Sequence, residues 1–189
     1  MDIKNSEEIL FKKWQKKRPR MAKDGVVNDM EYNRSSVKIL FILKEVNDWP
    51  NGYLRELLNR AEKWRTWNNI SRCNYGVQSY FKTGKFDFKN KITKKDRKEI
   101  LKNIAVINLK KASGGSSSNM GEIRQHALED KELLKEQVNL YTPDLVICCG
   151  TGNIIPQLNL FEKSKYTKSS EGVVYSNNSN PLIINYLHP

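Results

Sequence analysis

The sequence predicts an α/β fold, a three-layer α/β/α sandwich around a mainly parallel sheet of four strands. Four short runs are rich in Val, Ile and Leu, and the segments between them carry apolar residues at helical spacing. Strands that are apolar throughout and alternate with helices are typical of a parallel sheet covered on both faces. The four runs are residues 38–43, 105–109, 144–149 and 182–187.

Residues 1–37 are expected to form a basic helix and arm that pack on a single α/β domain of residues 38–189. Residues 5–8, Asn-Ser-Glu-Glu, resemble a helix capping box, and apolar side chains at helical spacing follow as far as Trp14. Pro19 interrupts the helix. Its basic block either contacts phosphates or forms a solvated surface; the lysines of this block are Lys12, Lys13, Lys16 and Lys17.

Further helices are expected between the strands, where apolar residues recur at helical spacing or a capping box begins a segment. Pro143 ends the longest of them, and Pro156 begins or interrupts the last. The helices are expected within residues 54–64, 93–104, 123–141 and 150–161, with a short edge strand at 172–175.

The composition favours a polyanionic partner. Among 189 residues, 33 Lys and Arg oppose 21 Asp and Glu, which gives a net charge of +12. Each basic side chain that neutralises a phosphate releases a counterion, so nucleic acid is the first expectation and a solvated, highly charged surface is the alternative. No apolar stretch approaches the ~20 residues that span a bilayer, and residues 1–13 are too polar for a secretory signal. We therefore expect a cytoplasmic protein without a membrane partner.

Three cysteines are too few and too unevenly placed for a disulfide framework. Cys148 and Cys149 are adjacent within an apolar run, and Cys73 is distant from both. This pattern favours buried, reduced thiols over a zinc site.

Polar side chains follow three of the predicted strands, at the edge of a parallel sheet where ligands bind. Glu45 follows the first strand, Asn108 stands at the end of the second, and His188 follows the last. A carboxylate can stabilise a cationic sugar and orient water, a carboxamide can read a base edge, and an imidazole can stabilise a departing base. Together they suit cleavage of a bond between a sugar and a base. Taken singly, Glu45 could be a surface acid, Asn108 a turn former and His188 a terminal residue.

These segments resemble the uracil-DNA glycosylase superfamily, in the family's order, over residues 38–189. Residues 39–47 are similar to the family's first strand and water-activating loop, with Glu45 at the acidic or amide catalytic position. Residues 105–108 resemble the strand that ends in the Asn that reads uracil. Residues 143–150 resemble the family's "Pro, acid, apolar strand, Gly" segment, and residues 182–189 the strand that ends in His-Pro.

The resemblance implies a monofunctional DNA glycosylase that extrudes a nucleotide and hydrolyses its N-glycosidic bond without a metal or an organic cofactor. It would act in base-excision repair or in defence against phage DNA. Glu45 would position water, Asn108 would read the base beside Lys44 and Asn47, and His188 would stabilise the leaving base. The partner would be DNA, with one nucleotide extruded, and we expect a monomer.

Contacts to the DNA backbone must offset the few kcal/mol that extrusion costs. The Gly/Ser-rich loop after the second strand and the basic residues near it are the candidates, together with the N-terminal lysines and an aromatic, Arg-containing segment at 64–80. The candidates are Lys110, Lys111, Ser113, Gly114, Gly115, Asn119, Arg72, Lys12, Lys13, Lys16 and Lys17. In the segment at 64–80, packing of Trp64 and Trp67 on the sheet is the alternative to base stacking.

The first loop departs from the family's pattern. Leu43 and Val46 replace its usual Gly and Pro, and Asn47 stands where the best-known branch has an aromatic that blocks bulky pyrimidines. We therefore expect a roomier pocket that takes uracil or a modified pyrimidine. The altered loop also leaves open a non-catalytic nucleic-acid-binding module on the same fold. A nucleotide-binding enzyme that uses residues 150–153 is a third possibility.

Overall fold

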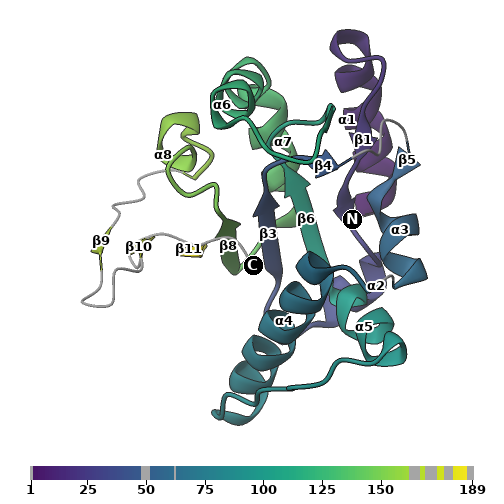
Figure 1. Ribbon diagram of the computed structural model, residues 1–189, viewed down its shortest axis with the longest axis vertical. Helices are drawn as coiled ribbons and strands as arrows, with labels where there is room; N and C mark the ends of the chain where they lie inside the picture. Colours follow the sequence, from purple (N-terminus) through teal and green to yellow (C-terminus); the bar gives the residue numbers. More distant parts are fainter. Residues whose placement is uncertain are drawn as a thin grey trace.

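The computed structural model describes residues 2–47, 52–61, 63–161 and 181–186, and the backbone of residues 167–168 and 174–176. In these residues, helices pack on a mixed β-sheet (Figure 1), so the α/β class expected from the sequence is confirmed. The helices are α1 (Ile3–Lys17), α2 (Asp29–Arg34), α3 (Leu54–Arg60), α4 (Arg65–Thr83), α5 (Lys94–Ile100), the 3₁₀ turn η1 (Leu101–Asn103), α6 (Met120–Glu129), α7 (Lys131–Tyr141) and α8 (Ile155–Leu158). The strands are β1 (Ala22–Lys23), β2 (Gly25–Val26), β3 (Ile39–Leu43), β4 (Val46–Asn47), β5 (Gly52–Tyr53), β6 (Ile104–Asn108), β7 (Ser113–Gly114), β8 (Leu145–Cys149), β9 (Thr167–Lys168), β10 (Val174–Ser176) and β11 (Leu182–Tyr186).

The main sheet has seven strands in the order β2-β6-β3-β8-β11-β10-β9. Its four inner strands, β6, β3, β8 and β11, are parallel neighbours and correspond to the four apolar runs of the sequence. Strands β2, β10 and β9 extend the sheet by antiparallel pairing. The sheet is therefore larger than the four strands expected. Strand β10 overlaps the short edge strand expected at 172–175, whereas β2 and β9 are two residues long and too short to show a strand pattern.

Helices cover both faces of the sheet. Alternate residues of a strand point to opposite faces, and accordingly Leu40 and Ile42 of β3 belong to one apolar cluster while Ile39 and Phe41 belong to a second. The first cluster includes side chains of α1, α6, α7 and α8, and the second those of α3 and α4. This arrangement is compatible with a three-layer sandwich.

Helix α1 belongs to the first of these cores. Phe11 and Trp14 are fully buried in the same cluster as side chains of α7. The helix begins earlier than the sequence suggested, because Asp2 is the N-cap and accepts the backbone N–H of Asn5. Residues 5–8, expected to form a capping box, instead lie within the helix, and Glu7 is buried.

Two of the expected helices are divided differently in the structure. Ala61 adopts a left-handed conformation and ends α3, and the 19-residue helix α4 follows, a helix that its many polar residues concealed in the sequence. Trp67 of α4 is buried, whereas Trp64 is 49% exposed, so the expected packing applies only to Trp67. The helix expected at 123–141 is two helices, α6 and α7, which meet at Asp130. Thr93 and Asp96 form the expected capping box of α5.

Candidate active site at the carboxyl ends of the sheet

The loops that follow β3 and β6 lie side by side. Leu43 at the end of β3 pairs with Asn108 at the end of β6. The pairing continues beyond the strands, because the backbone N–H groups of residues 109 and 110 donate to the carbonyls of residues 43 and 44, each at 3.0 Å. Beyond this point β4 pairs with β7, which sets Asn47 beside Gly114. The structure therefore brings the first loop and the Gly/Ser-rich loop together at one edge of the sheet.

Glu45 is held there in a buried ion pair. Lys110 Nζ donates to Glu45 Oε2 at 2.8 Å and lies 2.7 Å from Glu122 Oε1 of α6. The side chains of Glu45 and Lys110 are only 5% and 6% exposed. Burial disfavours the ammonium, but its hydrogen bonds to Glu122 and Glu45 outweigh burial and raise the pKa of Lys110. Lys110 is thus a buried partner of two carboxylates, which corrects the expectation that it grips the DNA backbone.

Gly114 closes over the Glu45 carboxyl group. A Cβ atom at residue 114 would lie 2.1 Å from Glu45 Cδ, far inside contact distance, whereas a Cβ atom at Gly115 would meet nothing within 4 Å. Any side chain at residue 114 would therefore displace Glu45. This close approach explains one glycine of the Gly/Ser-rich loop, and it shows how the loop positions the candidate catalytic carboxylate.

Asn108 is buried against an aspartate that sequence patterns did not identify. The backbone N–H of Asn108 donates to Asp24 Oδ2 at 2.7 Å, and its side-chain Nδ2 donates to the same oxygen at 3.3 Å. Asn108 Oδ1 is buried and has no hydrogen-bond partner among the residues described. Asp24 therefore orients the amide of Asn108 and leaves its acceptor oxygen unsatisfied.

Lys111 is the counter-ion of Asp24 and is fully buried. Its Nζ donates to both carboxylate oxygens of Asp24 and to Gln137 Oε1, each at 2.8 Å, and lies 4.5 Å from the ring centroid of Trp14. Burial lowers the pKa of Lys111, against the opposing effect of Asp24. The expectation that Lys111 contacts DNA is therefore wrong, because no atom of its side chain is exposed.

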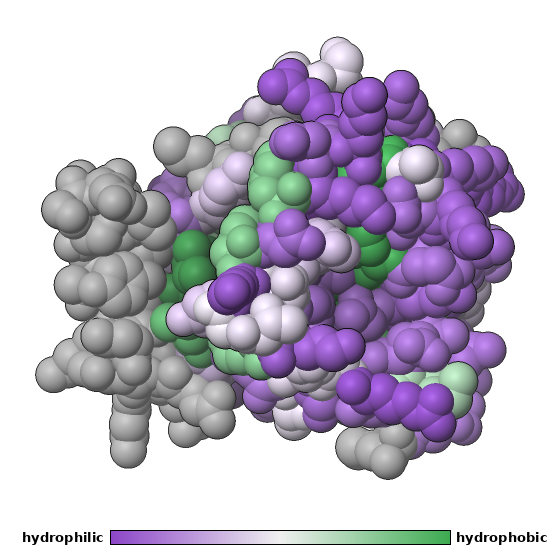
Figure 2. All heavy atoms as spheres, turned by 90° about the horizontal axis from the view of Figure 1, so that it is seen from below, coloured by the Kyte–Doolittle hydropathy of each residue, from purple (hydrophilic) through white to green (hydrophobic). Residues whose placement is uncertain are grey.

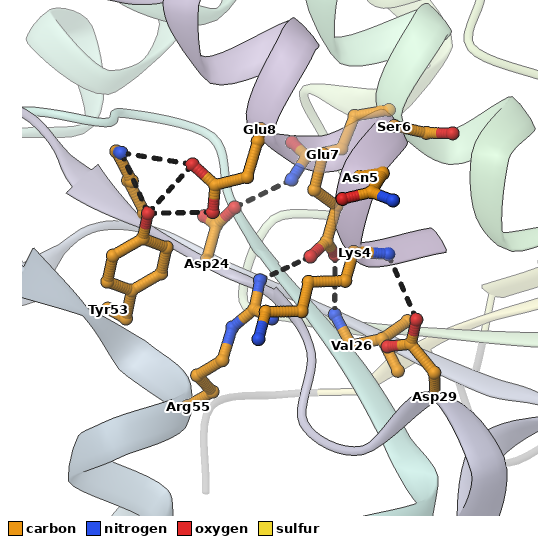
Figure 3. A network of polar contacts seen from close by, with 12 residues as sticks. Lys4, Asn5, Ser6, Glu7, Glu8, Asp24, Val26, Asp29, Tyr53 and Arg55 are labelled. Atoms are coloured by element: carbon orange, nitrogen blue, oxygen red, sulfur yellow. Dashed lines mark hydrogen bonds and ion pairs between the residues drawn. The ribbon is translucent and has the colours of Figure 1, made fainter. Parts of the chain in front are cut away.

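The buried polar contacts continue from Asp24 to α1. Gln137 donates to Asp24 at 2.8 Å and to the Tyr141 hydroxyl at 2.9 Å, and that hydroxyl donates to Glu7 at 2.8 Å. Glu7 also forms an ion pair with Arg55 and accepts the backbone N–H of Val26 (Figure 3). Burial raises the pKa of Glu7 to about 7, although Arg55 opposes the shift. No pattern in the sequence marks this network, because its members lie on elements far apart in the chain.

The remaining residues predicted to bind DNA occupy several parts of the surface. Lys44 and Ser113 are half-buried, and Asn47 and Gly115 are exposed near Glu45, while Asn119 is the N-cap of α6. On α1, Lys13 forms an exposed 2.6 Å ion pair with Glu136, and Lys12, Lys16 and Lys17 are exposed. His188, the predicted second catalytic residue, lies outside the described residues.

Arg72 does not lie with the other candidates. It belongs to α4, whose side chains Asn74 and Gln78 bond to residues that precede β6 and β3. Its guanidinium donates to the Asn69 side chain at 3.1 Å and to the Asn90 carbonyl at 3.0 Å. Arg72 therefore anchors a surface segment near the end of the sheet opposite Glu45, and its contact with DNA stays a prediction.

Residues 150–153, the alternative nucleotide-binding motif, join the ends of three strands. Thr151 Oγ1 donates to the Ile42 carbonyl of β3 at 3.0 Å. Gly150 has a φ of 68° and donates its N–H to the Tyr186 carbonyl of β11. A Cβ atom at Gly152 would lie 2.1 Å from the Asn185 side chain. The backbone conformation therefore favours glycine at residue 150, and packing against Asn185 requires it at residue 152.

Cys148 and Cys149 are buried thiols, as the sequence suggested, and burial raises the pKa of Cys149 to about 12. Within the described residues, no helix is long and apolar enough to cross a membrane. The same residues contain no group of three or more His, Cys, Asp or Glu that could hold a metal ion. The comparisons with models of protein families, with curated proteins and with solved structures find no match to this chain.

Proposed function

We propose that the protein is a DNA glycosylase that hydrolyses the N-glycosidic bond of an extruded uracil or modified pyrimidine nucleotide. The observation that carries the proposal is the adjacency of β3 and β6, which sets the loop bearing Glu45 beside Asn108 at the carboxyl edge of a parallel sheet. Further support comes from the strand order β6-β3-β8-β11, in which His188 follows the fourth strand in the sequence. The uracil-DNA glycosylase-like fold is part of this proposal.

In this reaction a water molecule adds to the sugar carbon, and the bond from that carbon to the base breaks. The bonding electrons leave with the base, and the proton that the water loses ends on that departing base. Glu45 is the residue that orients the water and stabilises the cationic sugar. Asn108 reads the base, and His188 donates a hydrogen bond to the departing base.

The contacts of Lys110 support a way in which Glu45 becomes available to a substrate in this proposal. Lys110 holds it, but Lys110 has a second partner in Glu122, which is 47% exposed. A bound nucleotide can therefore take over contact with Glu45 while Lys110 keeps one carboxylate. Lys110 is a positioning residue in this scheme, and Lys44 and Asn47 flank the nucleotide.

The test is abasic-site formation on oligonucleotides that contain one uracil, 5-hydroxymethylcytosine or glucosylated cytosine, detected by strand cleavage in alkali. The Glu45→Gln variant keeps the ion pair between Lys110 and Glu122, and we expect it to lose about 10²–10⁴-fold in rate while it still binds DNA. His188→Ala should lose about 10²–10³-fold. The matched control is Glu99→Gln, which removes a carboxylate from an exposed ion pair with Lys102 on a distant helix and should leave the rate unchanged.

A second candidate function is nucleic-acid binding without catalysis. The observation that favours it is the closure of the site, since Glu45 is covered by Gly114 and paired with Lys110. Absence of cleavage on every substrate, with DNA binding retained in the wild-type protein, would establish this alternative and refute the glycosylase proposal. Activity on uracil alone would refute the roomier pocket.

A further inference from the structure

The segment between α4 and α5, residues 84–93, folds back along α4. Ser79 donates to the Lys85 carbonyl at 3.2 Å, and Tyr75 donates to Asp87 at 2.8 Å. Further along, Arg72 donates to the carbonyl of residue 90. As the donors step back along α4 from residue 79 to 75 to 72, their partners advance from residue 85 to 87 to 90. Residues 84–93 therefore run antiparallel to the helix.

Four aromatic side chains of this unit are exposed. Tyr80, Phe81, Phe86 and Phe88 have between 53% and 59% of their surface accessible. The Phe86 ring lies against Gly76, where a Cβ atom would approach it to 2.3 Å, and the Tyr80 and Phe81 rings meet edge to face at 5.9 Å. Contact with α4 therefore holds Phe86 in place while much of its surface stays accessible.

Lysines are concentrated in the same stretch of chain as these rings. Residues 80–98 contain eight Lys or Arg and two Asp or Glu, so this tenth of the chain carries a net charge of +6, half of the total of +12. Asp87 is hydrogen-bonded to Tyr75, Asp96 is paired with Lys89, and Arg97 is buried, so the exposed charge is mostly lysine. Figure 2 views the molecule from this end and shows small apolar areas bordered by hydrophilic side chains. The exposed lysines are Lys82, Lys85, Lys91, Lys94, Lys95 and Lys98.

We propose that this aromatic–lysine surface, formed by residues 80–98, binds single-stranded nucleic acid. Aromatic rings stack on unpaired bases of any sequence, and lysines beside them neutralise the backbone phosphates. Bases within a duplex are already stacked, so only a single strand can use both components of the surface. The surface lies toward the end of the sheet where β3 and β6 begin, away from β4 and from the loop between β3 and β4 that carries Glu45 (Figure 1), and the proposal does not depend on base excision.

The chemistry of the exposed residues favours nucleic acid over an anionic membrane. All large exposed apolar side chains described in residues 80–98 are aromatic. The exposed aliphatic side chains Ile9, Met30 and Leu128 lie on α1, α2 and α6. A membrane-binding helix normally presents a continuous apolar face with aliphatic residues. Here, aromatic rings are interspersed with lysines along the chain, a combination that suits bases stacked between phosphates.

The test measures fluorescence anisotropy of labelled oligothymidine of about 20 nucleotides, a length that spans one or more binding sites of this type. Phe81→Ala and Phe88→Ala should each weaken binding about tenfold. Met30→Ala, which truncates an equally exposed apolar side chain on α2, should leave binding unchanged. The double variant Lys91→Glu/Lys95→Glu should weaken binding and make the dependence of log K on log salt shallower by about 0.7 for each phosphate that is no longer neutralised.

The charge reversal is paired with Lys12→Glu/Lys16→Glu on α1, because α1 is the competing basic surface. Oligouridine, a duplex of the same length and phosphatidylserine vesicles complete the set of probes. The proposal is supported if either single strand binds tightly and if the changes at residues 81, 88, 91 and 95 abolish that binding. The changes at residues 12 and 16 should leave it intact. Unchanged binding in both phenylalanine variants, equal affinity for the duplex, loss only in the α1 variant, or binding to vesicles alone would each overturn it.

Discussion

Replacement of Lys111 by methionine is the most direct test of the buried network behind Asn108. Methionine fills a similar volume, but it removes the ammonium that donates to Asp24 and Gln137 at 2.8 Å. Both charged side chains are fully buried, so Lys111→Met leaves the Asp24 carboxylate without its counter-ion. Breaking a buried pair in this way costs about 3–5 kcal/mol. For a protein of this size the loss corresponds to a melting temperature lower by about 6–20 °C.

The measurement is the free energy of unfolding in urea, with the double variant Asp24→Asn/Lys111→Met as the fourth corner of a cycle. The double variant should recover a large part of the loss, because both charges are then absent and the carboxamide oxygen introduced at residue 24 can still accept a hydrogen bond from Asn108. Lys102→Met breaks an exposed pair with Glu99 and should cost less than about 0.5 kcal/mol. A cost below about 1 kcal/mol for Lys111→Met, or a double variant no more stable than the single one, would refute the assignment.

Three further predictions concern other parts of the site. Because burial raises the pKa of Glu7 from 4.5 to about 7, the folded protein binds the proton more tightly than the unfolded chain does. The free energy of unfolding should therefore fall by about 3 kcal/mol between about pH 4.5 and pH 7, and urea titrations of Glu7→Gln should show this dependence flattened. Gly114→Ala should displace Glu45 and cost about 1–3 kcal/mol in the same assay, whereas Gly115→Ala should change little. Asn119→Ala should cost about 1 kcal/mol, since it removes the N-cap of α6; an unchanged midpoint would contradict this role.

Strands β3, β6 and β8 could be predicted from the sequence because they are buried along their whole length and hence almost entirely apolar. Strand β8 and its buried cysteines are an example. Helix α4 could not be predicted in the same way, since Asn74 is buried in it through hydrogen bonds to η1 and its neighbour rather than through apolar packing. Strands of two residues, such as β2, depend on tertiary pairing and leave no periodic pattern.

In the candidate site, too, the position of the loops could be predicted from the sequence, but the ion-pair partners of their residues could not. The placement of Glu45 beside the Gly/Ser-rich loop followed from the rule that parallel strands end at one edge of the sheet. The partners of these residues did not follow from it. Lys110 and Lys111 are adjacent in the sequence and read as one basic patch, yet they point to different buried carboxylates, Glu45 and Asp24. A lysine's burial depends on where a distant acid lies, and charge counting along the chain does not reveal this.

The packing of α1 on α7 has a consequence for synthesis in the cell. Glu7 and Tyr141, which share a hydrogen bond, are separated by 134 residues of chain. At an elongation rate of about 5–20 residues per second, α1 emerges on the order of ten seconds before the helix that covers it. During that interval Phe11 and Trp14 lack the side chains of α7 that belong to their apolar cluster. Until α7 is made, the nascent chain therefore presents a lysine-rich helix whose apolar face is only partly covered, a feature that chaperones can recognise, and this side of the core cannot be completed before α7 emerges.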